Sequence, residues 1–319
     1  MSHTSSGGQE TSTSQEWEGG ISGSTVKLVG IITMLIDHFA AAVLLRYMYA
    51  GGWSDRMYAL YTILRLVGRL GFPIFCFLLV EGFEKTRSKT KYALRLLLFA
   101  LISEVPFDLA FSAKVLEFGY QNVYFTLFLG LLALCAYDYL DNHKLPIVAQ
   151  WLLFIVGVVL FGARLRQYYV QHVLPLGDLF FMLGFCAICF FLAVMLIVYG
   201  LFMGWDGMRL IGMYLAVLCL FMIVADVMHT DYSGAGVMTI TAIYVFRGSN
   251  ILPMAAGCFV LTLMSSNEAA AFLSLIPVAK YNGKRGLKLK YFFYAFYPVH
   301  LLLLWLVAWR MGLGFIRVV

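Results

Sequence analysis

Residues 69–111, RLGFPIFCFLLVEGFEKTRSKTKYALRLLLFALISEVPFDLAF, contain two long apolar runs on either side of a short basic loop. Apolar runs of about 20 residues are long enough to cross a bilayer as helices. The loop carries Lys85, Arg87, Lys89 and Lys91, and basic loops favour the cytoplasmic side of a membrane. This stretch therefore predicts two membrane-spanning helices that meet at the cytoplasmic surface.

The same alternation of apolar runs and short polar loops continues along nearly the whole chain of 319 residues. Hydrophobic residues make up 62% of the chain and charged residues only 13%, which leaves too little polar surface for a soluble domain. We expect an all-α, polytopic integral membrane bundle of about ten or eleven transmembrane helices. The apolar runs place these helices at approximately residues 26–45, 57–83, 91–111, 121–140, 145–162, 176–202, 207–227, 233–247, 250–265, 267–281 and 290–311.

Residues 1–25 are rich in Ser, Thr, Gly and Glu and contain almost nothing that could be buried. We expect a disordered cytoplasmic tail there, followed by one transmembrane domain over residues 26–319. The loop before the last helix should also be cytoplasmic, because it holds Lys280, Lys284, Arg285, Lys288 and Lys290. With eleven spans, this arrangement puts the N-terminus inside and the C-terminus outside.

The cysteines and the net charge exclude several classes of function. All six cysteines lie in apolar stretches, which is typical of small buried hydrophobic residues and not of a disulfide framework. Cys186 and Cys189 have the spacing of a metal-binding pair, but no second pair or histidine lies at ligand spacing, so no metal is expected. The net charge of +6 comes from loops between apolar runs. We therefore expect a lipid bilayer as partner and no nucleic acid.

Four of the expected helices carry ionisable residues inside their apolar stretches. Each such group costs about 2.5–3.5 kcal/mol to insert and commonly marks function. At about 1.5 Å of rise per residue, a set of them lies about 15–20 Å from the cytoplasmic surface. This set consists of Asp37, His38, Arg69, Glu104 and His300. Ionisable groups at the same depth on four helices indicate a polar cavity. Arg65 lies one turn from Arg69 on the same helix face.

These residues also have structural interpretations. Arg65 and Arg69 could form ion pairs that only hold helices together, as buried opposite charges often do. Their candidate partners are Glu104 and Asp108 in the third expected helix.

His38 could likewise be a core histidine that is hydrogen-bonded to a backbone carbonyl. Asp37 precedes it directly, and neighbours on a helix point about 100° apart. If a carboxylate orients His38, Glu104 or Glu81 from another helix is therefore the more suitable group.

The chemistry of the set favours acyl transfer. Histidine is suited to take a proton from an amine or hydroxyl near neutral pH, and arginine is suited to phosphates or to a developing oxyanion. The loop residues Lys284, Arg285 and Lys288 could hold the phosphates of a donor at the membrane surface. Proton-coupled transporters also hold His, Asp and Arg at this depth, so a transporter or exporter is the alternative. The lack of two related halves in the sequence disfavours transport.

Residues 69–111 resemble the TraX family, which is named for a membrane protein of conjugative pili that acetylates the N-terminus of pilin. The resemblance continues, in order, through four further segments. These are KLVGIITMLIDH (27–38), NVYFTLFLGLLAL (122–134), HTDYSGAGVMTITAIYVFR (229–247) and KYFFYAFYPVHLLLLWL (290–306). Residues 163–205 are longer than the usual spacing of the family.

The TraX family is similar in layout to the wider membrane acyltransferase superfamily, whose signature pair is a histidine in the first helix and an arginine in the FP-containing segment. The resemblance implies that His38 is this histidine and the general base. Arg69 is then the arginine, with Arg65 as a second group for the donor or for the charged intermediate. Asp37, Glu104 and His300 would complete the catalytic set.

The resemblance also implies the substrates and the location. The co-substrate would be acetyl-CoA or another acyl-CoA, and the acceptor a peptide amine, a sugar, a lipid or a small molecule. The protein would be a multi-pass protein of the bacterial cytoplasmic membrane. Further candidates for the cavity, of second rank, are Glu81, Asp108, Asn122, Tyr124 and Tyr297.

Overall fold

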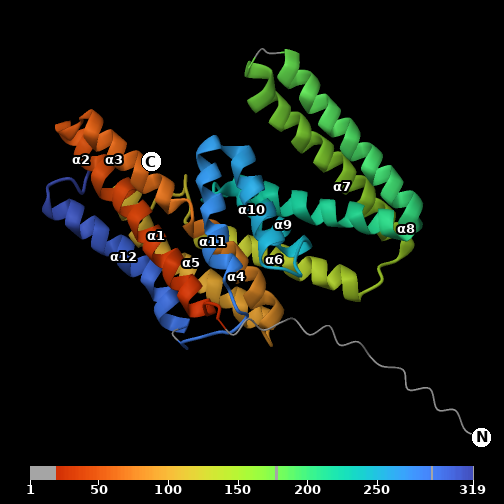
Figure 1. Ribbon diagram of the computed structural model, residues 1–319, viewed down its shortest axis with the longest axis horizontal. Coiled ribbons are helices and arrows are strands. Elements are labelled where there is room, and N and C mark those ends of the chain that lie inside the picture. Colours follow the sequence, from red (N-terminus) through yellow and green to blue (C-terminus); the bar gives the residue numbers. More distant parts are fainter. Residues whose placement is uncertain (1–18, 177–178, 289, 319) are drawn as a thin grey trace, which may run out of the picture.

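The computed structural model describes residues 19–176, 179–288 and 290–318 (Figure 1). Within these ranges the chain forms helices and no strand, with only two isolated bridges between extended residues. The prediction of an all-α protein is therefore confirmed. Residues 1–18 of the expected tail lie outside the described residues, and Ser22 caps a first helix that begins at Gly23.

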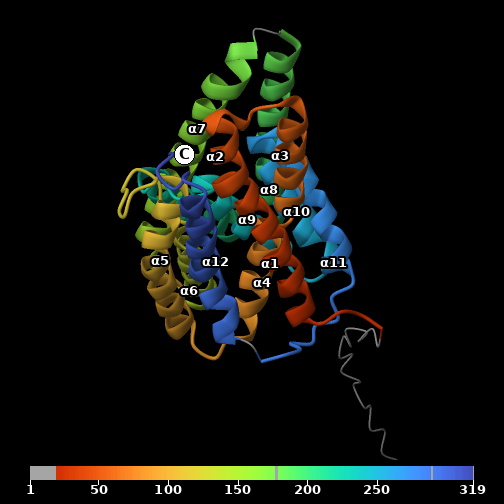
Figure 2. The ribbon, with the colours of Figure 1, turned by 90° about the vertical axis from the view of Figure 1, so that its left-hand side faces the viewer.

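The first half of the chain forms long helices that pack side by side (Figure 2). The first span runs from Gly23 to Gly52, with non-helical backbone angles at Gly51. It joins α1 (Gly23–Phe39) and α2 (Leu45–Tyr47) through two wider π-helical turns, Ala40–Leu44 and Met48–Gly52. The helices that follow are α3 (Asp55–Gly68), α4 (Gly71–Lys85), α5 (Lys89–Phe111) and α6 (Val123–Asn142).

The second half begins with a hairpin that projects away from the other helices (Figure 1, upper right). This hairpin is formed by α7 (Ile147–Tyr168) and the first part of α8 (Leu179–Val227), joined through the short turns Tyr169–Val173 and Leu174–Leu176. Gly204 (φ 72°) kinks α8 at the expected boundary between two helices. The remaining elements are α9 (Ser233–Val245), α10 (Ile251–Met264), the 3₁₀ helix η5 (Ser266–Ser274), α11 (Leu275–Ala279) and α12 (Lys290–Arg310).

The structure differs from the sequence prediction in two places that shape the site. The stretch expected as one helix over 57–83 is divided into α3 and α4 by a turn at Arg69 and Leu70, within the continuous apolar stretch Asp55–Lys85. The prediction of one α-helix over 267–281 is wrong, because the 3₁₀ helix η5 and the short helix α11 occupy this stretch. Ser and Asn at its start favour turns over helix interiors, and Pro277 has no N–H to donate to a helical ladder.

Six stretches of the described residues are long and apolar enough to cross a membrane: Gly23–Gly52, Asp55–Lys85, Val123–Asn142, Ile147–Gln171, Gly204–Val227 and Tyr291–Arg310. The chain is thus a multi-pass membrane protein. The number is lower than the predicted ten or eleven, chiefly because α9 and α10 are short apolar helices and the last internal span does not form. The 23 residues of α5 are also long enough, but they carry charges along their length.

The core lies where α4, α6 and α9 meet. Ile74, Leu131 and Ile240 are fully buried there. A Cβ atom at Gly130 would overlap Ile240. Small residues of this kind let membrane helices approach closely, so the glycine sets the spacing between α6 and α9.

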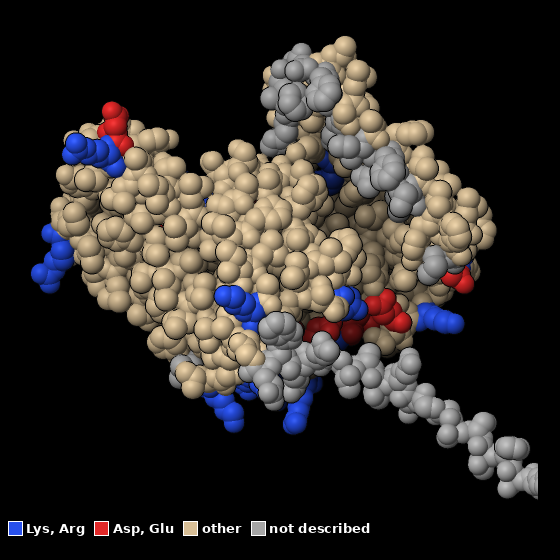
Figure 3. Space-filling model, viewed as in Figure 1, with Lys and Arg blue, Asp and Glu red and all other residues tan. Residues whose placement is uncertain are grey.

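The two basic loops predicted to be cytoplasmic lie at the same end of the molecule. The Lys85 ammonium donates to the Gly283 carbonyl at 2.8 Å, and the N–H of Ile21 donates to the Lys280 carbonyl at 2.8 Å. Basic side chains line the lower edge of the molecule in Figure 3. Because α1 starts at this end, its N-terminus lies on the same side as both loops.

The opposite end is closed by Arg46, which is fully buried. Its Nε donates to the carbonyl of Ile316 at 2.7 Å, and Nη2 donates to the carbonyl of Leu109 at 3.0 Å. The N–H of Val318 also donates to the carbonyl of Phe111 at 2.9 Å. The C-terminal segment is therefore tied to α2 and α5 at the end far from the basic loops.

The sidedness can be tested with single cysteines. We expect Arg87→Cys and Arg285→Cys to be protected from a membrane-impermeant thiol reagent in intact cells, because basic loops stay inside. Lys114→Cys, on the loop at the opposite end, is the control and should be labelled. Labelling is measured relative to the unsubstituted chain, which has cysteines of its own. Labelling of both loop variants from outside would show that the orientation is inverted.

Candidate functional site

A cavity of about 160 Å³ lies among the spanning helices, at the C-terminal end of α1 and so about halfway along the first span, Gly23–Gly52. Its walls come from α1, α3, α4, α5, α6 and α12, from the turn before α9, and from Val318 near the C-terminus. The polar and charged side chains that line it are Asp37, His38, Tyr61, Arg65, Arg69, Tyr120, Asp231, Tyr232 and Tyr297. The structure therefore brings together most of the residues that shared a depth in the sequence.

The centre of the site is a pair of histidines from the first and last helices. His38 Nδ1 lies 2.7 Å from His300 Nε2, and the two rings are nearly parallel, with an interplanar angle of 6°. His300 Nδ1 lies 2.8 Å from the Phe296 carbonyl oxygen. Glu104 and Glu81 were the more suitable groups if a carboxylate orients His38, but both have other partners. His300 takes this place.

These contacts fix the tautomers of both rings. A carbonyl only accepts, so His300 Nδ1 carries a proton, and in the neutral ring Nε2 is an acceptor. His38 Nδ1 must then be the donor to His300. This leaves the lone pair of His38 on Nε2, which has no hydrogen-bond partner among the described residues. The arrangement is that of a neutral histidine ready to accept a proton.

Pro298 explains how α12 accommodates this arrangement. A proline has no N–H, so the carbonyl of Tyr294, four residues earlier, loses its helical donor. The Tyr124 hydroxyl donates to this carbonyl at 3.1 Å. Tyr124 thus has a contact with α12 but does not line the cavity, whereas Tyr297 lines it and packs edge-on against His38.

The first charged pair of the cavity joins α3 to α1. Arg65 Nη1 lies 2.5 Å from Asp37 Oδ2, and both side chains are largely buried. The other oxygen of Asp37, Oδ1, is buried without a hydrogen-bond partner among the described residues. Asp37 therefore keeps one free acceptor in the cavity.

Gly68 makes this pair possible. A Cβ atom at this position would overlap the Asp37 side chain. The glycine therefore allows α3 to approach α1 closely enough for Arg65 to reach the carboxylate, and it ends α3 one residue before Arg69.

The second charged pair joins Arg69 to a residue that the sequence analysis missed. Arg69 Nη1 lies 2.9 Å from Glu268 Oε1 on η5. The structural alternative in which the two arginines pair with Glu104 and Asp108 is therefore wrong. Glu268 escaped notice because the stretch 267–281 was expected to be a spanning helix, on which it would lie near one end.

Asp231 and Tyr232 were also missed as site residues. The Tyr120 hydroxyl donates to Asp231 Oδ1 at 2.7 Å, and Tyr232 stacks on Phe72 with ring centroids 3.6 Å apart. His229, Tyr232 and Ser233 have positive φ angles, which non-glycine residues adopt at a cost and mainly at functional sites. The only signal in the sequence was an acidic residue in the HTDYSG segment between two apolar runs.

Glu104 and Asp108 lie outside the cavity lining, on the side of α5 that faces the start of α6. The Asn122 side-chain amide donates to the Glu104 carboxylate, and Asn122 Oδ1 accepts the N–H of Tyr124 at 3.0 Å. Asp108 accepts the N–H of Glu117 at 2.7 Å. These three residues anchor the α5–α6 connection.

The predicted donor-binding residues of the loop before α12 lie at the end of the molecule that carries both basic loops, away from His38. The loop that carries Lys284, Arg285 and Lys288 is joined to the start of α1 by a hydrogen bond from the N–H of Gly23 to the Lys284 carbonyl at 2.8 Å. None of the three lines the cavity. His38 follows Gly23 by fifteen residues, which is about 22 Å along the helix.

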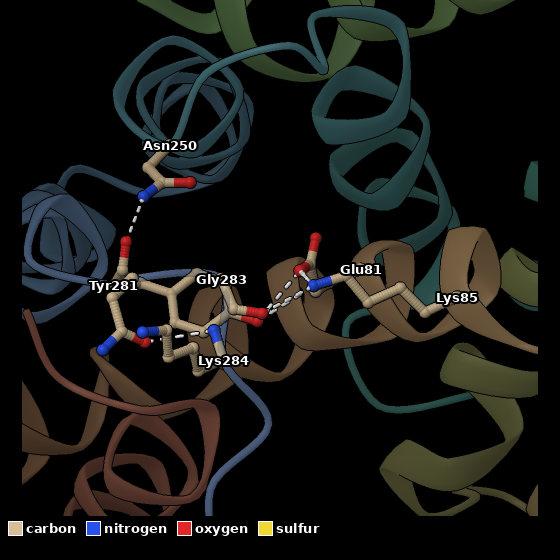
Figure 4. A network of polar contacts seen from close by, with 7 residues as sticks. Glu81, Lys85, Asn250, Tyr281, Gly283 and Lys284 are labelled. Atoms are coloured by element: carbon tan, nitrogen blue, oxygen red, sulfur yellow. Dashed lines mark hydrogen bonds and ion pairs between the residues drawn. The ribbon is translucent and has the colours of Figure 1, made fainter. Parts of the chain in front are cut away.

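The same loop is fixed by a polar network around Tyr281 (Figure 4). The Tyr281 hydroxyl donates to Glu81 Oε1 at 2.9 Å, and Glu81 also pairs with Lys85. Burial and the hydrogen bond to Glu81 raise the pKa of Tyr281. Asn250 donates to the Tyr281 carbonyl at 2.8 Å. Glu81 thus holds the basic loop in place and is not part of the His38 cavity.

In the part of the chain that the structure describes, no group of three or more His, Cys, Asp or Glu residues could hold a metal ion. The side chain of Cys189 is not among those that the structure describes. That Cys186 and Cys189 bind no metal therefore stays a prediction.

Comparison with known proteins gives two matches. A family model described as TraX protein matches residues 22–183 and 179–308. The probable fimbrial assembly protein FimC, serogroup H1, of Dichelobacter nodosus is 43% identical over 117 residues. The match covers 34% of the chain and 43% of that relative, so the chain spans less than half of the relative's length. No solved structure matches the chain.

We expect Gly68→Ala to destabilise the protein by about 1–3 kcal/mol, the usual cost of overpacking. The overlap with Asp37 must outweigh the gain of up to about 1 kcal/mol that alanine brings to a helix interior. Thermal unfolding in detergent measures the change. Gly162→Ala is the control, because a Cβ atom there meets nothing within 4 Å. Equal melting temperatures for the two variants would contradict the close approach.

Proposed function

Because the chain belongs to the TraX family, we propose that it is a membrane-bound acyltransferase. It moves an acyl group, acetyl in the first instance, from acyl-CoA to an amine or hydroxyl acceptor near or across the bacterial cytoplasmic membrane. One observation carries the proposal. His38 lies in a cavity with two arginines, and its contact with His300 leaves Nε2 as a free base.

In this proposal His38 is the general base and His300 supports it. The acceptor gives its proton to His38 Nε2, so the ring becomes a cation. His300 is held by the Phe296 carbonyl with its own lone pair directed at His38 Nδ1. This lone pair continues to accept the Nδ1–H of the cation and spreads its charge. A neutral supporting group suits a site where a further buried charge would be expensive.

The arginines act on the charge that develops at the acyl group. As the acceptor nitrogen or oxygen bonds to the acyl carbon, the carbonyl oxygen becomes an oxyanion. The guanidinium groups of Arg65 and Arg69 line the cavity, and fixed donors of this kind stabilise such an anion in a site that excludes water. The carbon–sulfur bond then breaks, and the CoA thiolate leaves with the proton held by His38.

The dimensions of the site favour a short acyl group on a long carrier. A cavity of about 160 Å³ is smaller than the pockets of about 300–1,000 Å³ that commonly enclose small-molecule ligands, so it suits the reacting groups better than a whole nucleotide. A donor whose phosphates bind the loop at Lys284, Arg285 and Lys288 must reach about 22 Å to His38. A thioester at the end of a flexible arm meets this requirement.

We expect His38→Ala to lower the rate of acyl transfer by about 10²–10⁴-fold, the usual contribution of a positioned acid–base group. Purified wild-type and variant proteins are compared for acetyl-CoA hydrolysis and for transfer to candidate acceptors. His143→Ala is the control, because His143 is exposed at the end of α6 and is hydrogen-bonded to Tyr139. We expect the His38→Ala protein to be folded and to bind CoA, but to show almost no acyl transfer.

The same protein reconstituted in liposomes separates the enzyme from the transporter. A wild-type chain that turns over no acyl-CoA but moves a solute in a His38-dependent way would overturn the acyltransferase proposal.

The donor site is tested by changing Lys284, Arg285 and Lys288 together to glutamine. We expect the KM for acyl-CoA to rise and kcat to change little, because phosphate contacts at the surface contribute equally to substrate and transition-state binding. Steady-state kinetics at several ionic strengths provide the measurement. Changing Arg56, Lys114 and Arg310 to glutamine at the opposite end is the charge-matched control. An unaltered KM would move the donor site away from this loop.

A further inference from the structure

Glu268 is a buried acid that the proposed reaction does not use directly. We infer that Glu268 is a positioning residue, which holds the guanidinium of Arg69 so that its remaining N–H groups face the cavity. This inference rests on the proposed acyl transfer, and it assigns to η5 the task of orienting a group that stabilises charge.

The geometry of η5 supports this role. Glu268 has a side chain only 9% exposed, and η5 packs against α3 and α4, on either side of Arg69. The carbonyl of Ala271 accepts hydrogen bonds from Cys258 at 3.3 Å and from Ser274 at 2.5 Å. The Cys258 contact ties η5 to α10 and the Ser274 contact lies within η5, so the carboxylate is presented by a fixed segment.

The ion pair between Arg69 and Glu268 leaves some of its hydrogen-bonding groups unused. A pair that served only to hold two segments together would have no reason to do so. One oxygen of Glu268 contacts one terminal nitrogen of Arg69. The second oxygen of Glu268 and the Nε of Arg69 are buried and have no partner among the described residues. A bidentate arginine–carboxylate pair would have used more of these groups. The contact with Glu268 uses only one terminal nitrogen, and Tyr232 also lies against the guanidinium. Other N–H donors of Arg69 therefore remain for a substrate oxygen.

The surrounding charges show what Glu268 prevents. The charges of Asp37 and Asp231 are close enough to act on Arg69, and Asp37 is already paired with Arg65. Without Glu268, Arg69 would turn toward one of these two acids, because an unpaired buried charge is costly. Its N–H groups would then no longer be directed at the reacting acyl group.

The test is Glu268→Gln, which keeps the shape and removes the charge. We expect kcat for acyl transfer to fall about 10–100-fold, as misplaced catalytic groups commonly cause, and the KM for acyl-CoA to change little. Glu84→Gln is the matched control, because Glu84 pairs with Arg247 at 3.0 Å far from the cavity lining. It should leave kcat unchanged.

A double-mutant cycle shows whether Glu268 acts through Arg69. Arg69→Lys keeps the charge but removes the planar fork, so alone it should also lower kcat strongly. In the Glu268→Gln background it should cost little more, whereas independent roles would give multiplied losses and overturn the inference. If Glu268→Gln does not fold, Glu268→Asp keeps the charge with a shorter reach and should show the same loss of kcat.

The two proposals fail in different ways. A folded wild-type protein without any acyl transfer overturns the proposed function. An active wild type with an equally active, folded Glu268→Gln variant overturns the positioning role alone.

Discussion

The high free-energy cost of a charge in the interior of a membrane protein determines how this site is built. Each arginine of the cavity has a carboxylate of its own, Asp37 for Arg65 and Glu268 for Arg69. Removing either partner would leave an uncompensated buried charge, which is far more costly than the pair itself. The helices α1, α3 and α4 and the segment η5 therefore have to meet at this point, and the rest of the bundle is arranged around their contact.

The same constraint explains why a histidine, and not an acid, supports His38. The cavity already contains the carboxylates of Asp37 and Asp231 and the two arginines. A further carboxylate behind the base would add a buried charge, whereas His300 is neutral and takes its orientation from the Phe296 carbonyl. The direction of proton acceptance is thus set by the main chain of α12, which is a rigid element. Such preorganisation requires no rearrangement when the acceptor arrives.

The sequence predicted well how deep in the membrane the ionisable residues lie, and poorly which side of their helix faces the site. The rise of a helix is constant, so Asp37, His38 and His300 could be placed at one level, and the structure joins them. Glu104 has the same depth, but it faces Asn122 at the start of α6, because depth does not specify which side of a helix faces the site. Glu268 and Asp231 could not be found in this way, since they lie in a 3₁₀ helix and a turn where helical periodicity gives no position.

These two irregular segments also argue that the cavity is more than a packing defect. Non-helical backbone at membrane depth is tolerated only where protein buries it or where it lines a cavity. The turn at 229–233 has positive φ at His229, Tyr232 and Ser233, at a cost on the order of 1–3 kcal/mol each. Hydrogen bonds between Gln121 and the main chain of His229 and Asp231 offset part of this cost. A regular helix could have packed here at lower energy, but it would not have placed Asp231 and Tyr232 in the lining of the cavity that contains His38.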